Sequence, residues 1–188
     1  MSVQIKYFVH GTTTDNLEKK ATGWLPGILS DKGINQGVEL AKTIENEHFD
    51  VVFCSDLKRA VESSKLNFYN RDIEIIKDAR LRECNYGDFN GQDSKLVNYN
   101  EHISKPFPNG ESMLDVEKRI KDFLVYLNKN FDGKKVAIVA HRAPQLAIEV
   151  LTMGKTWEQA LADDWRNTKN WQPGWKYEIN SFNQKELI

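Results

Sequence analysis

The sequence has 188 residues, and its 26 Lys and Arg nearly balance its 27 Asp and Glu, which gives a formal net charge of −1. A chain of this length most simply folds as one domain, here residues 1–188, and buries enough surface to need neither disulfides nor a structural metal. The balanced charge excludes a general attraction to nucleic acid or to an acidic membrane. Any anion that the protein binds must therefore be held by a local cluster of donors.

The remaining composition favours a cytoplasmic location. The N-terminus has no secretory signal, and no apolar run approaches the roughly 18 residues that a membrane helix needs. Cys54 and Cys84 do not have the spacing of metal ligands, so we expect reduced and mostly buried thiols. We expect no nucleic-acid partner and no membrane partner.

Strand-like and helix-like spacings of apolar residues alternate along the chain. We expect strands over residues 3–9, 51–54, around 73–76 and 135–140, and helices over 31–46, 56–69 and 112–130. Helix starts are marked by Ser55, by Ser112 with Asp115, by Pro144 in a further helix, and by Thr156 with Gln159. Continuously apolar strands such as "VVFC" and "VAIVA" suit a sheet that is covered on both faces. The pattern predicts an α/β fold, a three-layer sandwich with a mostly parallel central sheet and helices on both faces.

Two further segments have less regular patterns. Residues 84–111 show no period and predict a loop or a short insert, whereas "WKYEINSF" near the C-terminus alternates and predicts an edge strand. Such an edge could be covered, or it could pair across a twofold axis in a homodimer. Four of the five tryptophans fall late in the chain, at 157, 165, 171 and 175. They could pack the C-terminal elements or form an aromatic lid over a site.

Two histidines follow apolar strands, His10 after "IKYFV" and His141 after "VAIVA". Ligands of α/β sheets bind at the carboxyl ends of the strands, so both histidines fall where a site is expected. Either one alone could be a hydrogen-bonded residue of the scaffold. Arg59, near the start of the helix after "VVFC", and Glu83, in "LRECNYG", can reach the same edge. Each of these could instead be a solvated surface residue.

A pocket with two imidazoles, a guanidinium and a carboxylate, and with backbone donors at Gly11 and Thr12, suits phosphoryl transfer. That reaction needs a nucleophile, cations for the non-bridging oxygens and an acid for the leaving oxygen. The sequence contains no H-x-x-x-H or H-E-x-x-H motif, no clustered aspartates and no G-x-x-x-x-G-K-[ST] loop. We therefore expect neither a metal nor another cofactor.

Six blocks then follow one another along residues 3 to about 151. They are "VHGTTTDN", "TGWLPGILSDKGINQG", "CSDLKRAVESS", "LRECNYGDFNGQ", "PNGESMLDVEKR" and "VAIVAHRA". In sequence and in order they resemble the motifs of the histidine phosphatase (phosphoglycerate mutase-like) superfamily. Any single block would be a weak signal, but six in the family's order are specific.

The resemblance implies a role for each matching residue. His10 would be the nucleophile that forms a phosphohistidine, and Arg59 and His141 would hold the phosphoryl oxygens. Glu83 would give a proton to the leaving alcohol and then take one from water. The positions that would line the phosphate or substrate side of the pocket are Asn16, Thr22 and Gly23.

The sequence departs from the family pattern at two positions next to the histidines. Val9 stands where the family has its opening arginine, and Arg142 stands where the family has a glycine. Loss of one preorganised donor to a transition-state oxygen costs on the order of 3–4 kcal/mol. We hypothesise that Arg142 restores the missing guanidinium, the alternatives being that it points to solvent or binds a substrate carboxylate or a second phosphate.

These residues predict a metal-independent phosphatase that hydrolyses a small phosphorylated metabolite. The chain is short for a mutase of the family, although the "TGW" and "CNYG" blocks resemble that branch, so phosphoglycerate mutase-type transfer is an alternative. A catalytically impaired member that only binds a phosphorylated ligand or a protein is a second alternative, because Val9 replaces the first arginine.

Overall fold

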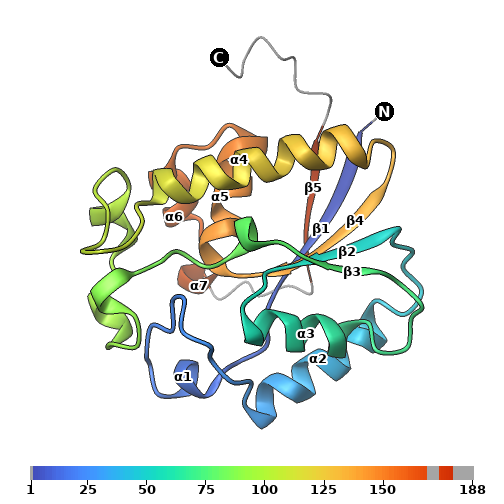
Figure 1. Cartoon of the computed structure of the whole chain (residues 1–188), viewed down its shortest axis with the longest axis horizontal. Coiled ribbons are helices and arrows are strands. Elements are labelled where there is room, and N and C mark those ends of the chain that lie inside the picture. The colour runs from blue at the N-terminus through green and yellow to red at the C-terminus, as the bar shows by residue number, and fades with distance from the viewer. Residues whose placement is uncertain (1, 169–173, 180–188) are drawn as a thin grey trace.

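The computed structural model describes residues 2–168 and 174–179, and a five-stranded sheet runs through their centre (Figure 1). The strands are β1 (Val3–Val9), β2 (Val51–Cys54), β3 (Ile75–Lys77), β4 (Lys135–Ala140) and β5 (Trp175–Ile179), in the order β3-β2-β4-β1-β5. The first four are parallel, and β5 pairs antiparallel with β1. The mostly parallel sheet is confirmed, and β5 is the edge strand predicted from "WKYEINSF", whose last three residues lie outside the described part.

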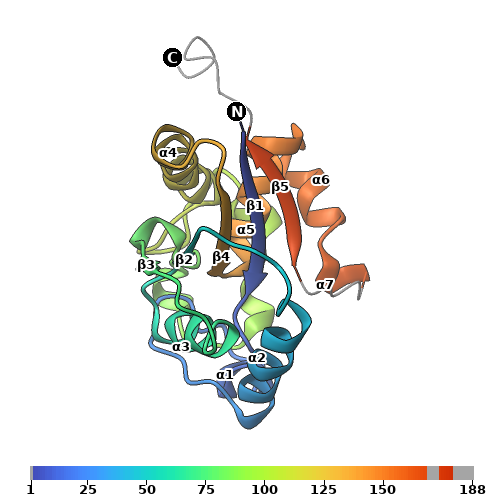
Figure 2. The same cartoon turned by 90° about the vertical axis from the view of Figure 1, so that its right-hand side faces the viewer.

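Helices cover both faces of this sheet, as the apolar strands predict. They are α1 (Thr14–Leu17), α2 (Asp31–Thr43), α3 (Lys58–Asn67), α4 (Met113–Asn130), α5 (Arg142–Met153), α6 (Trp157–Ala162) and α7 (Trp165–Thr168). Figures 1 and 2 show α2 and α3 on one side of the sheet and α4 and α5 on the other. The three-layer α/β sandwich is therefore confirmed.

Each face of the sheet has its own apolar core. On the α2 and α3 side, Phe8 of β1 packs edge-to-face against Phe68 with ring centroids 6.4 Å apart. On the other side, Phe53 of β2 packs against Phe123 of α4 at 5.4 Å. Since successive strand residues point to opposite faces, a strand between two cores is apolar at nearly every position, as in "VVFC" of β2 and "VAIVA" of β4.

The helix caps follow the sequence signals with one exception. Ser112 with Asp115 and Thr156 with Gln159 form capping boxes at the starts of α4 and α6. The helix start predicted at Ser55 is wrong, because the Ser55 hydroxyl accepts a hydrogen bond from Leu57 N–H in a turn that precedes α3.

Residues 84–111 form a compact insert rather than an open loop. It contains the 3-10 helices Gly87–Phe89, Ser94–Leu96 and Tyr99–His102, and a further one, Ala79–Leu81, precedes it. Tyr86, Tyr99 and Phe107 bury their rings in the larger core. The insert thus becomes one wall beside the carboxyl ends of the strands.

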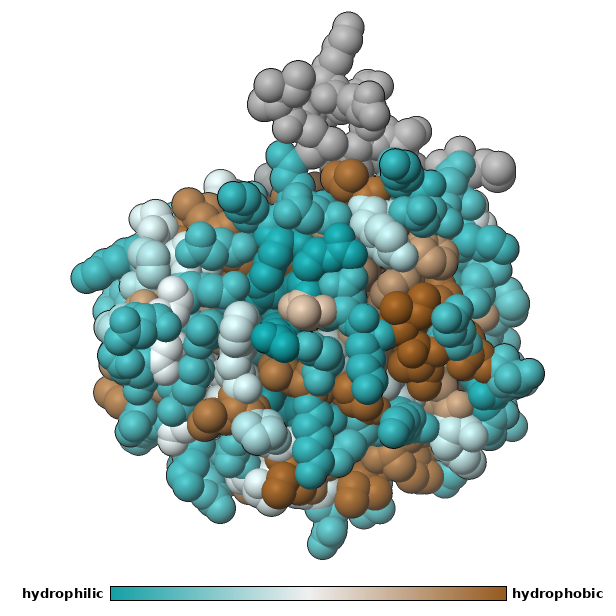
Figure 3. Space-filling model, viewed as in Figure 1, coloured by the Kyte–Doolittle hydropathy of each residue, from teal (hydrophilic) through white to brown (hydrophobic). Residues whose placement is uncertain are grey.

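The surface agrees with this layered core. Most of the face in Figure 3 is hydrophilic, and hydrophobic residues gather over β3 at the edge of the sheet. Within the described residues, no helix is long and apolar enough to cross a membrane.

Candidate active site

The two strand-end histidines lie side by side. Val9 of β1 is in register with Ala140 of β4, and the His10 N–H donates to the Ala140 carbonyl at 3.0 Å. Because the strands are parallel neighbours, the next residue of each reaches the same edge. The rings of His10 and His141 have centroids 5.1 Å apart at an interplanar angle of 61°.

The hydrogen bonds of His10 define its reactive nitrogen. Its Nδ1 lies 2.7 Å from the Gly11 carbonyl, so Nδ1 carries the proton and Nε2 carries the lone pair. Arg59 Nε donates to this Nε2 at 3.3 Å. Burial and, next, the positive charge of Arg59 lower the pKa of His10 to about 3. The imidazole is therefore neutral at pH 7, the form in which it can act as a nucleophile.

Arg59 is held by the loop that follows α1. It projects from the first turn of α3 and is only 1% exposed. Its two terminal nitrogens donate to the carbonyls of Gly23 at 2.7 Å and Leu25 at 3.0 Å. Gly23 has a φ of +54°, and a Cβ there would lie 1.7 Å from the Asn90 side-chain oxygen. Glycine is thus required where the loop closes over Arg59.

His141 is completely buried at the start of α5. Tyr7 fixes its backbone, since the tyrosine hydroxyl donates to the His141 carbonyl at 2.7 Å and accepts from the His141 N–H at 3.0 Å. Neither ring nitrogen has a hydrogen-bond partner among the described residues. Burial, followed by the charges of Arg59 and His10, lowers the pKa of His141 well below its ordinary value. A neutral ring of this kind keeps one N–H that can donate to an anion.

The Glu83 carboxylate sits at the N-terminus of α5. One oxygen accepts from the N–H groups of Cys84 at 2.9 Å and Ala143 at 3.0 Å, and the other accepts from the N–H of Arg142 at 3.3 Å. Tyr99 OH donates to the first oxygen at 3.4 Å. These donors fix the orientation of the carboxylate, and the helix dipole favours a negative group at this end.

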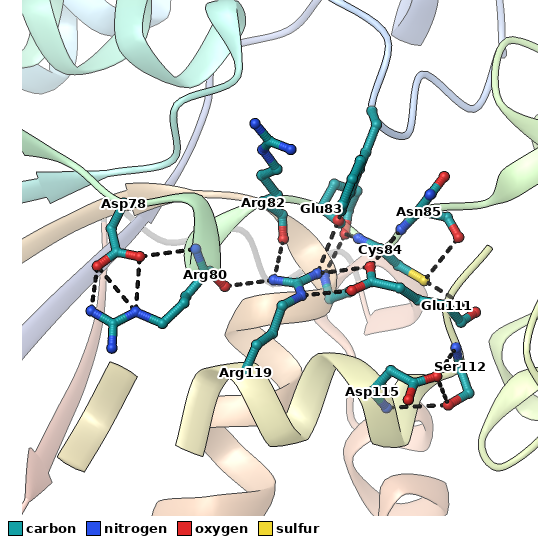
Figure 4. Close-up of polar contacts among 12 residues, drawn as sticks. Asp78, Arg80, Arg82, Glu83, Cys84, Asn85, Glu111, Ser112, Asp115 and Arg119 are labelled. Atoms are coloured by element: carbon teal, nitrogen blue, oxygen red, sulfur yellow. Dashed lines mark hydrogen bonds and ion pairs between the residues drawn. The ribbon is translucent and has the colours of Figure 1, made fainter. Parts of the chain in front are cut away.

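Hydrogen bonds and an ion pair of Arg119 hold the Glu83 loop in place (Figure 4). Arg119 reaches from α4 and donates to the backbone carbonyls of Arg80, Arg82 and Glu83 at 2.5, 2.7 and 3.0 Å. Its guanidinium also pairs with Glu111, whose carboxylate accepts the Asn85 N–H at 2.8 Å. The block "PNGESMLDVEKR" therefore supplies the support of the site rather than its reacting groups.

Two cavities meet at His10. The smaller has a volume of about 160 Å³ and includes Glu83, Arg59, Asn16, Thr22, Gly23 and Arg142 in its lining. The larger, of about 410 Å³, extends towards α2 and α3 and includes Val9, Gly11, Thr12, Asn16, Gln36 and Asn67. The described residues contain no group of three His, Cys, Asp or Glu that could hold a metal ion.

Sequence comparison places this geometry in a known family. The family model described as the histidine phosphatase superfamily (branch 1) matches residues 8–177. The chain belongs to this superfamily. Phosphoserine phosphatase 1 of Hydrogenobacter thermophilus is 28% identical over 155 residues, which are 77% of this chain and 74% of that protein.

A curated relative with a different activity, and a solved structure with the same fold, also match most of the chain. The 2,3-bisphosphoglycerate-dependent phosphoglycerate mutase of Methylorubrum extorquens is 27% identical over 164 residues, 78% of this chain and 77% of the mutase. The structure of a mycobacterial glucosyl-3-phosphoglycerate phosphatase matches with a TM-score of 0.76 and 22% identity, over 86% of this chain and 84% of that one. The comparisons thus show phosphatases and mutases as relatives.

The structure brings together the predicted residues of this superfamily site, with one difference. Gly11 and Thr12 line the larger cavity, and their N–H groups already donate to Ser63 Oγ at 3.0 Å and Gln36 Oε1 at 2.9 Å. Their N–H groups thus hold the loop against α2 and α3, whereas the sequence predicts them as donors to a ligand. For Arg142, the alternative of a side chain that points to solvent is excluded, because the guanidinium pairs with the buried Asp164 at 2.5 Å. That Arg142 restores the missing guanidinium stays a prediction.

Sequence reasoning missed several residues of the pocket wall. Arg166 lines both cavities, and Lys20 lines the smaller one. Tyr99 lies beneath the Arg142 guanidinium, 4.4 Å from its central carbon to the ring centroid. No family motif contains these residues, so only their position in the folded chain identifies them.

The packing role expected of the late tryptophans is seen in the described part of the chain, and the aromatic lid stays a prediction. Trp157 and Trp175 are buried and pack the C-terminal elements, whereas Trp165 lines the larger cavity. Trp171, the residue at the centre of the expected lid, lies outside the described residues.

Proposed function

We propose that the protein is a metal-independent phosphomonoester hydrolase that works through a phosphohistidine at His10. The observation that carries the proposal is the neutral His10 imidazole, whose unprotonated Nε2 faces the Arg59 guanidinium at 3.3 Å. Beside it lie a second neutral imidazole, His141, and the oriented carboxylate of Glu83. A nucleophile, donors for phosphoryl oxygens and a proton carrier thus share one edge of the sheet.

The chemistry has two steps. In the first, His10 Nε2 attacks phosphorus, the bond to the ester oxygen breaks, and protonated Glu83 gives its proton to the departing alkoxide. In the second, water attacks the phosphohistidine, Glu83 accepts a proton from the water, and the phosphorus–nitrogen bond breaks to release phosphate. Arg59 and the ring N–H of His141 stabilise the negative non-bridging oxygens in both steps.

Phosphoryl transfer to a second alcohol, as in a mutase, is the alternative favoured by a specific observation. Several relatives are phosphoglycerate mutases, among them the Methylorubrum extorquens enzyme that spans 78% of this chain. Both reactions use the same phosphohistidine. They differ in whether water or an acceptor alcohol reaches it.

The test is phosphate release from p-nitrophenyl phosphate and from a panel of sugar, glycerate, phosphoserine and nucleotide monophosphates in excess EDTA. We expect turnover that survives chelation, is abolished in His10→Ala, and persists in the control His48→Ala, whose side chain is 80% exposed. Interconversion of phosphoglycerates without net phosphate release would favour the mutase. Absence of turnover on the whole panel would contradict the enzyme proposal and favour a ligand-binding member.

A further inference from the structure

The cations around His10 have unequal freedom to bind a phosphoryl group. Val9 places an apolar side chain at the end of β1, so the strand next to the nucleophile supplies no charge. Both terminal nitrogens of Arg59 donate hydrogen bonds to backbone carbonyls. The Arg142 guanidinium forms an ion pair with Asp164 and a cation–π contact with the Tyr99 ring. Both arginines contribute positive charge, but much of their donor capacity is used within the protein.

Arg166 differs from these two arginines. It belongs to α7, and it lines both cavities that meet at His10. Its backbone N–H donates to Asp164 at 3.0 Å, and its guanidinium lies 4.7 Å from the Trp165 ring centroid. The guanidinium has no hydrogen-bond acceptor among residues 2–168 and 174–179. Its planar set of donors is therefore available to an oxyanion.

We propose that Arg166 binds the non-bridging oxygens of the phosphoryl group at His10, and so supplies from the C-terminal part of the chain the cation that Val9 cannot. This inference rests on the proposed function, since it assigns a further residue to the same site. Arg142 then acts on Arg166 through their shared carboxylate. One buried Asp164 faces two guanidinium-bearing residues, so the cluster keeps a net positive charge towards the cavities.

The electrostatics of the two histidines agree with this placement. The charge of Arg166 is one of the causes that lower the pKa values of His10 and His141, after burial and Arg59. A cation that repels protons from both rings is close enough to attract an oxyanion held between them.

Arg166 is tested first by its removal. We expect Arg166→Ala to lower kcat/KM for p-nitrophenyl phosphate by about 10²-fold, the usual loss for one donor to a transition-state oxygen. The kcat/KM of Arg166→Lys should lie between those of the wild type and Arg166→Ala, because lysine keeps the charge but loses the planar set of donors. The matched control is Lys129→Ala, which removes an exposed cation of α4 that lines neither cavity and should change kcat/KM less than threefold.

Val9 offers a rescue that a merely structural role for Arg166 would not show. Val9 and Arg166 line the same cavity, whose volume of about 410 Å³ has room for an arginine on β1. We expect the double variant Val9→Arg with Arg166→Ala to recover at least tenfold of the lost kcat/KM. An Arg166→Ala enzyme with wild-type kcat/KM would overturn the proposal, as would a folded double variant without recovery.

Binding of inorganic phosphate, measured by calorimetry, separates this inference from the proposed function. We expect its affinity to fall at least tenfold in Arg166→Ala and to stay unchanged in Lys129→Ala. If the wild type bound phosphate in this Arg166-dependent way without turning over any ester, the hydrolase proposal would fail and the assignment of Arg166 would stand. If the wild type hydrolysed esters but Arg166→Ala left the phosphate affinity unchanged, the hydrolase proposal would stand and the assignment of Arg166 would fail.

Discussion

Glu83→Gln offers a sharp test of the proton carrier because it changes one atom and little volume. The carboxylate accepts hydrogen bonds from three backbone N–H groups, including those of Arg142 and Ala143 at the start of α5. Glutamine keeps one acceptor oxygen and turns an NH₂ group towards donors that now have no acceptor. We expect this mismatch to lower the free energy of unfolding by about 1–3 kcal/mol, the usual cost of an unsatisfied buried group.

The catalytic effect of Glu83→Gln should depend on the leaving group. An alkyl phosphate needs a proton on its departing oxygen, and loss of the acid should lower its kcat/KM by about 10²–10⁴-fold. p-Nitrophenolate leaves without a proton, so its kcat/KM, which reports steps up to the phosphohistidine, should change much less. Its kcat should still fall, because the second step loses the base that takes a proton from water.

Glu111→Gln is the matched comparison. Glu111 supports the same loop through Arg119 and the Asn85 N–H, but it lines neither cavity. Its substitution should lower kcat/KM for the alkyl and the aryl ester by the same factor, since it disturbs position and not proton transfer. If Glu83→Gln also lowered both by one factor, Glu83 would be a positioning residue and the assignment of the acid would be wrong.

Three further predictions concern pH, packing and thiol reactivity. The folded state holds His10 neutral down to a pKa of about 3, and the pKa of His141 is also lowered. The free energy of unfolding should therefore be highest above pH 6.5 and fall towards pH 3 by up to about 1.4 kcal/mol per pH unit for each histidine. A free energy of unfolding that did not change over this range would contradict the prediction. In Gly11→Ala, the new Cβ would lie 2.5 Å from a backbone carbonyl of α2, so thermal melts should show a loss of about 1–3 kcal/mol, and an unchanged Tm would refute the close approach. Burial raises the pKa values of Cys54 and Cys84, so both thiols should react with Ellman's reagent only after unfolding, and fast labelling of the native protein would count against the core described above.

The fold and the central pair of histidines could be predicted because they depend on short-range patterns. A strand such as "VAIVA" must be buried on both faces, and the residue after a parallel strand must reach the sheet edge where ligands bind. His10 and His141 therefore follow from strand ends alone. The helix start predicted at Ser55 is wrong for a local reason, since a serine side chain can stabilise a turn as readily as the first turn of a helix.

The parts that escaped prediction depend on contacts between distant segments. The N–H groups of Gly11 and Thr12 look like free donors in a glycine-containing loop, but Ser63 and Gln36 approach them only when α2 and α3 pack beneath β1. Arg166 stands in no motif, and it lines the same cavities as His10 because α7 precedes β5, which pairs with β1. The spacing of apolar residues along the sequence does not report contacts between segments that lie far apart in the chain.

The placement of Arg166 makes substrate binding depend on the C-terminal part of the chain. An arginine at position 9 would be fixed by β1 itself, in register with β4, and would be present as soon as the two strands pair. A guanidinium on α7 is held at the site by contacts outside β1, among them the hydrogen bond from the Arg166 N–H to the Asp164 carboxylate. The contribution of Arg166 to the charge at the nucleophile therefore depends on the packing of these elements, whereas Arg59 and the nucleophile itself do not. Any change that loosens α7 should weaken phosphate binding before it alters the pairing of β1 with β4.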